Sequence, residues 1–131
     1  MANVFSAFEV KIKFSLTVTQ QDIDDIMCTA LEGGIAYWCC MAKVIGKRLS
    51  ECDSEQISRG GELKLYDVEG DGVWILTRDK LLNGIKLWAE RGGNQCSAIQ
   101  GNGTLDTGEI DAEVADMIVR YALFRGVVFG E

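Results

Sequence analysis

The chain has 131 residues, of which 47% are apolar and 25% are charged, a composition that is typical of one globular domain and excludes an intrinsically disordered chain. Its 20 acidic and 13 basic residues give a formal net charge of -7, which repels nucleic acid at long range and argues against a binder of duplex DNA. No window approaches the roughly 18 consecutive apolar residues of a membrane helix, and no leader-like segment opens the chain, so we expect a cytosolic protein without membrane contact.

Cysteine and histidine content limits the chemistry that the chain can perform. The five cysteines are odd in number and form no C-x-x-C pair, which is typical of reduced thiols in a cytosol. Because the chain has no histidine, a zinc site would need four cysteines at a suitable spacing, and that spacing is missing. The absence of histidine also removes the usual general base at neutral pH. We therefore expect no metal, no cofactor and no enzymatic activity.

Residues 10–18 form the clearest periodic segment. Their apolar residues occupy every second position and alternate with lysine, serine and threonine, a pattern that predicts a half-buried strand. Thr19 then offers a helix N-cap, with Asp22 three residues later. The helical spacing that follows ends at Gly33 and Gly34, so a short amphipathic helix is expected between the cap and these glycines.

The middle of the chain predicts further strands. Residues 35–45 are apolar at both even and odd positions, which fits a strand or a helix, and their aromatic and β-branched residues favour a strand. Residues 47–58 are mostly polar and fit either a loop or an irregular helix. Residues 63–66 and 73–77 have strand-like patterns separated by turn formers, so they predict a β-hairpin.

The last third of the chain predicts two helices. Thr77 is expected to cap a helix that ends at Gly92 and Gly93, and the segment 94–108 fits an ordered loop or a small hairpin. Asp106 or Thr107 is expected to cap a final helix, and residues 127–129 to add a last strand. This irregular order predicts a single α+β domain spanning 1–131, with an antiparallel sheet of about four to five strands packed by two to three helices.

Two acidic patterns imitate cation sites. The run D-V-E-G-D-G at 67–72 resembles the start of an EF-hand loop, but position twelve is Arg78, so a hairpin turn is the better interpretation. Glu109 and Glu113 would share one helical face, with Asp106, Asp111 and Asp116 nearby, which fits a divalent cation or, as the more ordinary interpretation, a solvated helix start. Neither pattern is taken as a metal site.

The segment S-R-G-G at 58–61 has the most specific local chemistry. Arg59 beside Gly60 and Gly61 could combine a bidentate guanidinium with backbone donors in an anion-binding nest, whereas the ordinary interpretation is a glycine turn. Trp38 offers an aromatic face for stacking, although aromatic residues at such spacing more often belong to the core, and Arg120 lies among aromatic residues that fit an oligomer interface. These five residues are the expected ligand-binding residues, and no catalytic residue is expected.

Three stretches carry a resemblance to a known family. They are T-Q-Q-D-I-D-D-I-M-C-T-A-L-E-G-G-I-A-Y-W-C at 19–39, S-E-Q-I-S-R-G-G at 54–61 and D-T-G-E-I-D-A-E-V-A-D-M-I-V-R-Y-A-L-F at 106–124. With them the chain resembles a family of small, uncharacterised proteins of phages and prophages of low-GC Gram-positive bacteria. The resemblance implies an accessory protein that counters host defences in the host cell cytosol, and it transfers no site residue.

Two mechanisms fit this setting. In the first, a non-enzymatic homo-oligomer sequesters a nucleotide-like immune signal through converging arginines, backbone amides and aromatic stacking. In the second, the acidic domain docks on a basic host defence protein, such as a CRISPR nuclease, and blocks it. A phage accessory protein that acts only by protein-protein contacts, or an enzyme that uses carboxylates, are further alternatives. The sequence favours the first mechanism narrowly, because Arg59-Gly60-Gly61 is the local pattern with the most specific chemistry.

Overall fold

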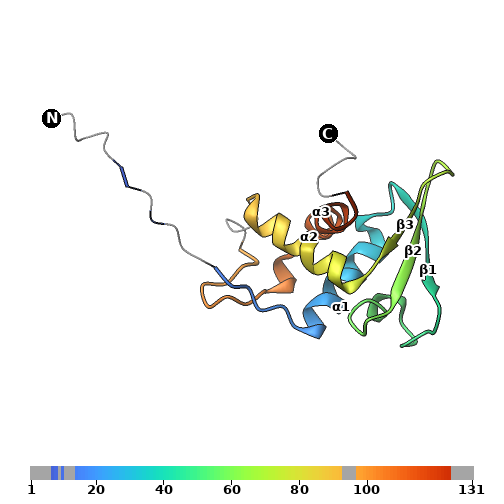
Figure 1. Cartoon of the computed structure of the whole chain (residues 1–131), viewed down its shortest axis with the longest axis horizontal. Helices are drawn as coiled ribbons and strands as arrows, with labels where there is room; N and C mark the ends of the chain where they lie inside the picture. The colour runs from blue at the N-terminus through green and yellow to red at the C-terminus, as the bar shows by residue number, and fades with distance from the viewer. Residues whose placement is uncertain (1–6, 9, 11–13, 93–96, 125–131) are drawn as a thin grey trace.

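The structure, a computed structural model, describes residues 7–8, 10, 14–92 and 97–124. Three α-helices pack against one face of a three-stranded sheet, which confirms the α+β class (Figure 1). The elements in chain order are α1 (Gln20–Thr29), a π-turn (Ala30–Gly34), β1 (Cys39–Ile45), a 3-10 turn (Asp53–Glu55), β2 (Glu62–Asp67), β3 (Val73–Leu76), α2 (Arg78–Glu90), a second 3-10 turn (Thr107–Glu109) and α3 (Ala112–Phe124).

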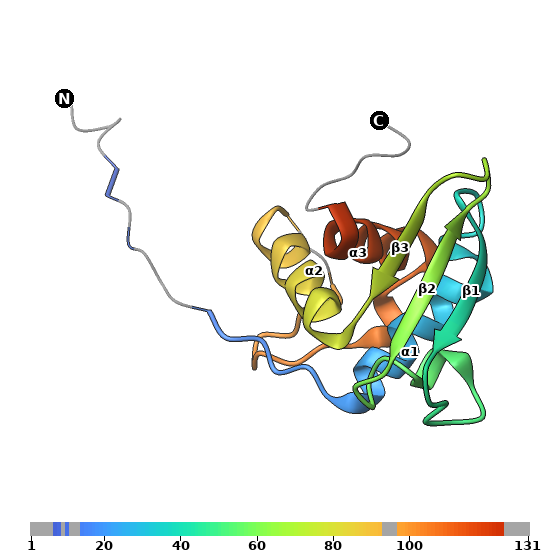
Figure 2. The ribbon, with the colours of Figure 1, turned by 45° about the vertical axis from the view of Figure 1, so that its right-hand side comes forward.

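The sheet is antiparallel, with strand order β1-β2-β3. The hairpin predicted around 67–72 is confirmed: β2 and β3 flank this turn, and Gly70 has a φ of 102°, a conformation that glycine adopts readily. Figure 2 shows the three strands side by side, with the helices behind them. The described residues thus form three strands, fewer than the four to five expected.

The strand predicted at 10–18 is the main reason for this difference. In the described part of that segment, Thr17 forms an isolated parallel bridge with Thr104, and its amide donates to the carbonyl of Gly103 at 2.7 Å. Val10 and Phe14 are 78% and 55% exposed. An alternating pattern gives a segment one apolar face. To form a strand, the segment must also pair with the edge of a neighbouring strand, and the pattern does not supply that edge. Residues 9, 11–13 and the strand expected at 127–129 lie outside the described residues.

The segment 30–45 divides into a turn and a strand. The Thr19–Asp22 capping box starts α1 as predicted, and the helix then widens into the π-turn instead of stopping before Gly33. At Gly34 a Cβ atom would lie 2.7 Å from the carbonyl oxygen of Ala112, so glycine permits this close approach to α3. The prediction of a strand at 35–45 is therefore correct for 39–45 and wrong for 35–38.

Residues 47–58 form an irregular loop that contains the 3-10 turn Asp53–Glu55.

The start of the last helix also differs from the prediction. Asp106 caps only the 3-10 turn, where its carboxylate accepts a hydrogen bond from the amide of Gly108. Ile110 then has an extended backbone, which buries its side chain, and the carboxylate of Asp111 accepts from the amide of Val114. Helix α3 consequently begins at Ala112, because the need to bury Ile110 interrupts the helical path.

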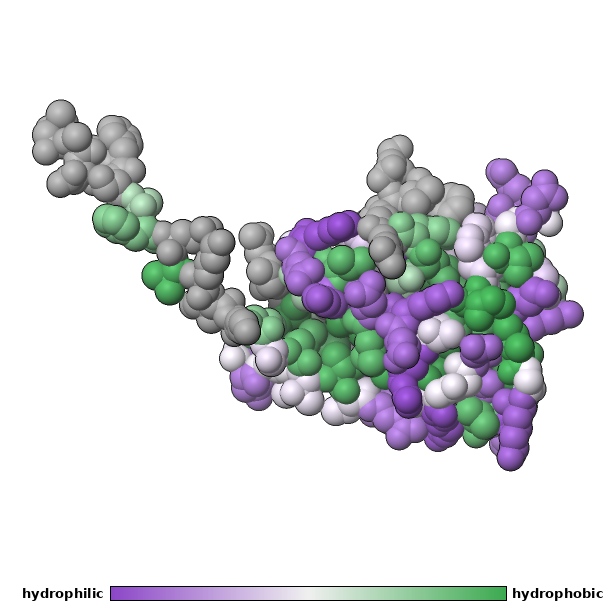
Figure 3. All heavy atoms as spheres, in the orientation of Figure 1, coloured by the Kyte–Doolittle hydropathy of each residue, from purple (hydrophilic) through white to green (hydrophobic). Residues whose placement is uncertain are grey.

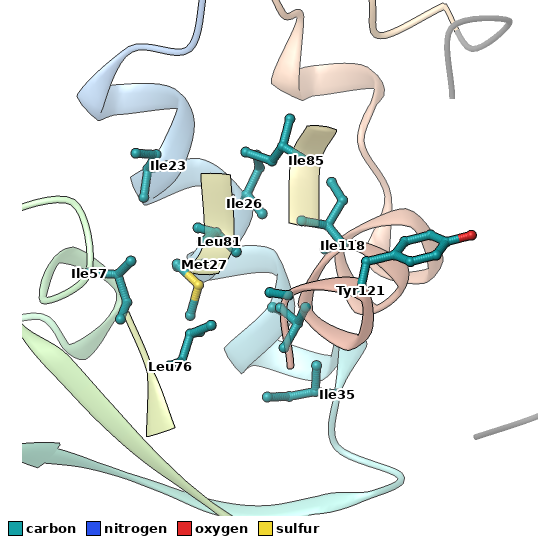
Figure 4. Close-up of a cluster of buried hydrophobic side chains, with 14 of the residues drawn as sticks. Ile23, Ile26, Met27, Ile35, Ile57, Leu76, Leu81, Ile85, Ile118 and Tyr121 are labelled. Atoms are coloured by element: carbon teal, nitrogen blue, oxygen red, sulfur yellow. The ribbon is translucent and has the colours of Figure 1, made fainter. Parts of the chain in front are cut away.

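The hydrophobic core lies between the helices and the inner face of the sheet. Figure 4 shows side chains from α1, α2, α3 and β3 meeting there, including Met27, Leu76, Leu81 and Ile118, all fully buried. Helices α2 and α3 approach most closely at Gly84, where a Cβ atom would lie 2.5 Å from the carbonyl oxygen of Ile118. The absent side chain of Gly84 therefore sets the distance between these two helices.

We expect Gly84→Ala to destabilise the protein by about 1–3 kcal/mol, because the added methyl group must push α2 away from α3. Helix propensity alone predicts the opposite sign, a gain of about 1 kcal/mol. Urea unfolding followed by circular dichroism measures the difference. Asn83→Ala, at an exposed position of the same helix, is the control and should be neutral or slightly stabilising. A Gly84→Ala protein as stable as the control would refute this packing.

Candidate functional site

The carboxylate of Asp116 is the centre of a buried polar network. Its Oδ1 accepts a hydrogen bond from the indole Nε1 of Trp38 at 2.7 Å, and its Oδ2 accepts one from the hydroxyl of Tyr37 at 2.8 Å. The same Oδ2 lies 2.8 Å from Nη2 of Arg120. Asp116 and Arg120 are only 3% and 6% exposed, so their opposite charges compensate each other in a poorly hydrated environment.

Two segments that are distant in sequence build this network. Tyr37 and Trp38 belong to the turn that follows the π-turn, whereas Asp116 and Arg120 stand four residues apart on α3, a spacing that places them on one helical face. The Trp38 ring packs edge-on against Trp74 and Phe124, with centroid distances of 5.6 and 6.0 Å. Trp38 is therefore anchored in the core, and its indole N–H fixes one oxygen of Asp116.

A cleft of about 340 Å³ opens beside the network. Its lining residues are Gly33, Gly34, Tyr37, Ala112, Glu113, Asp116 and Arg120. The volume is at the lower end of the range for small-ligand pockets, so the cleft suits one side chain or one small ring system. Tyr37 is 54% exposed, and the guanidinium carbon of Arg120 lies 5.9 Å from the centre of its ring, so the ring combines a cation–π contact inside the protein with a surface exposed to solvent.

One exposed carboxylate lines this cleft, and further exposed carboxylates lie close to its lining residues in the sequence. Glu113 lines it, and Glu109 and Asp111 precede Glu113 on the 3-10 turn and at the start of α3. Glu32, also exposed, precedes the lining residue Gly33 in the sequence. Because Asp116 already compensates the charge of Arg120, the carboxylate of Glu113 leaves the lining of the cleft with a negative charge.

Burial and hydrogen bonding change the acidity of nearby groups. Partial loss of hydration and the hydrogen bond to Asp116 raise the pKa of Tyr37 above its ordinary value. Burial likewise raises the pKa of the Cys39 thiol, and a hydrogen bond with Glu32 raises that of Cys28. Both thiols are thus less readily ionised than a free cysteine, which makes them poor nucleophiles.

Arg59, Gly60 and Gly61 lie in a different part of the molecule, in the turn after Asp53–Glu55. The guanidinium of Arg59 forms an ion pair of 3.0 Å with Glu55. The amide of Gly60 donates to the carbonyl of Ile57, and the amide of Gly61 donates to that of Gln56. This pair of bonds is the Schellman arrangement that ends a helical turn, and the φ of 88° at Gly60 is the left-handed conformation it requires.

The structure thus brings two of the five expected ligand residues together, Trp38 and Arg120, and leaves Arg59, Gly60 and Gly61 in a separate turn. Sequence reasoning considered Asp116 only as an acidic residue near a possible cation site, not as the residue that joins Trp38 and Arg120, and it did not select Tyr37. The available signal was the spacing of four between Asp116 and Arg120 on a predicted helix, which makes two opposite charges neighbours on its surface.

Other acidic residues have local structural partners. Asp22 completes the capping box of α1, Asp24 accepts from the hydroxyl of Ser58, and Asp25 accepts from that of Thr107. Within the described residues, no group of three or more histidine, cysteine or acidic side chains is arranged to hold a metal ion. A larger apolar groove of about 1250 Å³ lies between α2 and residues 14–18, and some of its flanking residues lie outside the described ranges.

Comparison with protein-family models, with curated proteins and with solved structures gave no match. Among the described helices, none is long and apolar enough to cross a membrane.

We expect Asp116→Asn to lower the free energy of unfolding by about 3–5 kcal/mol, because it removes the charge that compensates buried Arg120. Asp53→Asn makes the same substitution in the exposed Arg48–Asp53 pair, which has a comparable distance of 2.7 Å, and should cost less than about 1 kcal/mol. Urea unfolding of the two variants tests the difference, and equal losses would contradict a buried, compensated pair.

The raised pKa of Tyr37 predicts a pH dependence of stability. A group whose pKa rises on folding stabilises the folded state fully below its unfolded pKa, here about 10, and loses that contribution as the pH rises toward its folded value. The free energy of unfolding of the unmodified protein should therefore fall more steeply above pH of about 10 than that of Tyr37→Phe. Parallel curves for the two proteins would show that folding does not raise the pKa of Tyr37.

Proposed function

We propose that this protein is a non-enzymatic binding protein whose cleft beside Asp116 accepts a basic side chain of a protein partner. The supporting observation is the exposed carboxylate of Glu113 in the lining of the cleft, beside the partly exposed ring of Tyr37, with Glu109 and Asp111 close to Glu113 in the sequence. In the host-defence setting implied by the sequence resemblance, the partner is a basic defence protein such as a CRISPR nuclease. That setting rests on the resemblance alone.

The chemistry of the cleft suits an arginine or lysine side chain. Glu113 offers an ion pair at the mouth, and the face of Tyr37 attracts a cation through its quadrupole. Gly33 and Gly34 line the cleft without side chains, which leaves room for the side chain of the partner. Asp116 is already engaged by Tyr37, Trp38 and Arg120, which makes it an element that orients Tyr37 rather than a free base.

Sequestration of a nucleotide-like signal is the weaker proposal. Arg120 is paired with Asp116, Arg59 is paired with Glu55, and the amides of Gly60 and Gly61 donate within their own turn. A phosphate would have to compete with each of these partners and approach several carboxylates. A homo-oligomer also remains a proposal, but the cleft does not require one, because a single chain supplies all of its lining residues.

We expect the triple variant Glu109→Gln, Asp111→Asn and Glu113→Gln to bind an oligo-arginine peptide about tenfold more weakly, a loss of about 1.4 kcal/mol. Each substitution removes a charge at nearly constant size, and Asn at 111 keeps an N-cap for α3. Fluorescence anisotropy of a labelled peptide measures the affinity. Tyr37→Leu should weaken binding by a similar factor, because it removes the aromatic face.

The matched control removes three exposed carboxylates elsewhere, with Glu51→Gln, Glu69→Gln and Asp71→Asn. It has the same net charge as the triple variant and should bind the peptide nearly as well as the unmodified protein. Equal weakening by both sets would mean that the peptide responds only to net charge, and the cleft would then have no specific role. An Arg59→Ala protein should be indistinguishable from the unmodified protein.

A further inference from the structure

One face of the sheet is left open by the described part of the chain. Leu63, Leu65 and Leu76 point toward the helices and are fully buried. Since successive side chains of a strand alternate between faces, the strand register assigns the intervening positions to the opposite side. We call this side the open face, and it includes Met41, Lys43, Lys64, Tyr66, Val73 and Ile75. Figure 3 shows apolar side chains bordered by hydrophilic ones over the strands.

The open face has an arrangement of like charges that costs stability. Lys43 of β1 is directly opposite Lys64 of β2, and like charges in this relation repel. The next residue in the same row is Ile75 of β3, whose carbonyl accepts a hydrogen bond of 2.7 Å from Nζ of Lys80. Two facing ammonium groups therefore lie on the open face in a chain of net charge -7, with a third, that of Lys80, bound to the backbone of the edge strand β3, and with Glu62 as an acidic residue on the open face.

The row of side chains next to these lysines has the aromatic ring of Tyr66 at its centre. Tyr66 stands between Met41 and Val73 in the cross-strand register, and Met41 and Val73 are 42% and 44% exposed. Nζ of Lys64 lies 5.4 Å from the centre of the Tyr66 ring, within the range of a cation–π contact. A flat group stacked on Tyr66 would thus lie close to the lysine row.

We propose that the open face binds single-stranded nucleic acid, with a base stacked on Tyr66 and neighbouring phosphates on Lys43 and Lys64. Phosphates would relieve the repulsion between the facing lysines, which is the charge complementarity that selects a polyanion. The ring of Tyr66 favours a nucleic acid over an acidic peptide, because every base offers a face for stacking. This surface and its ligand are distinct from the acidic cleft and its basic partner.

The test is the change in fluorescence anisotropy of a labelled oligothymidylate and a labelled oligouridylate, each of about 12 nucleotides, at about 50 mM salt. We expect dissociation constants of about 1–100 µM, typical of electrostatic binding without sequence selection. The double variant Lys43→Gln and Lys64→Gln should weaken binding at least about tenfold and reduce the logarithmic salt slope by about 1.4, since it removes two phosphate contacts.

Two controls separate the open face from general electrostatics. Lys47→Gln with Lys86→Gln removes the same charge from exposed positions elsewhere and should leave the affinity nearly unchanged. Tyr66→Phe should retain binding, whereas Tyr66→Leu should weaken it about tenfold, because only the former keeps a ring for stacking. Urea unfolding of every variant verifies folding, and the Lys43→Gln, Lys64→Gln protein should be no less stable than the unmodified one.

Three outcomes would overturn the proposal. The first is the absence of any anisotropy change up to about 100 µM protein, beyond the range of non-specific electrostatic binding. The second is equal weakening by the two lysine pairs, which would trace binding to net charge alone. The third is tighter binding of an oligo-glutamate peptide than of either oligonucleotide, which would assign the open face to an acidic protein partner.

Discussion

Burial of the Asp116 charge is the constraint on which the rest of the structure depends. A carboxylate at 3% exposure is strongly destabilising unless donors replace its lost water. Here the donors come from the turn between α1 and β1, through Tyr37 and Trp38, and from the next turn of α3, through Arg120. The network therefore holds together the helix layer and the beginning of the sheet, and it fixes the cleft that Tyr37 borders.

Charge is distributed unevenly over the two layers. In α1, Asp22 completes the capping box, and Asp24 and Asp25 accept hydrogen bonds from Ser58 and Thr107. The carboxylates near the start of α3 are exposed to solvent. The outer side of the sheet has facing lysines instead. A chain whose total charge is strongly negative can thus present a locally positive surface, since screening confines each field to roughly 8–10 Å at ordinary salt. Net charge alone is a weak guide to the partners of such a protein.

Much of the fold could be predicted from local sequence. The Thr19 capping box, the Thr77 cap and the glycine-containing turn before Val73 are short-range signals with specific geometry, and each appears where expected. The alternation at 10–18 was misleading because a strand also needs a partner edge, which is a property of tertiary structure. The start of α3 was displaced because burying Ile110 outweighs the early cap at Asp106.

The candidate site was only partly predictable, for a related reason. Trp38 and Arg120 could be selected for their chemistry, but Asp116 joins them through hydrogen bonds from Trp38 and Tyr37, which are 78 and 79 positions away. No local pattern reports such a contact. Conversely, Arg59-Gly60-Gly61 had a distinctive local pattern, and the structure accounts for it with a helix-ending turn and an ion pair to Glu55.

The long sequence separation within the Asp116 network also has a consequence for biosynthesis. The β2–β3 hairpin closes a short loop and can form in microseconds, whereas joining Trp38 to Asp116 requires closure of a far longer one, with a higher entropic cost. A nascent chain on the ribosome that has not yet reached Ala112 lacks both the carboxylate and the apolar face of α3. Its Trp38 and Tyr37 would meanwhile remain without their native partners, which makes this interval a point of vulnerability to aggregation and a natural stage for chaperone binding.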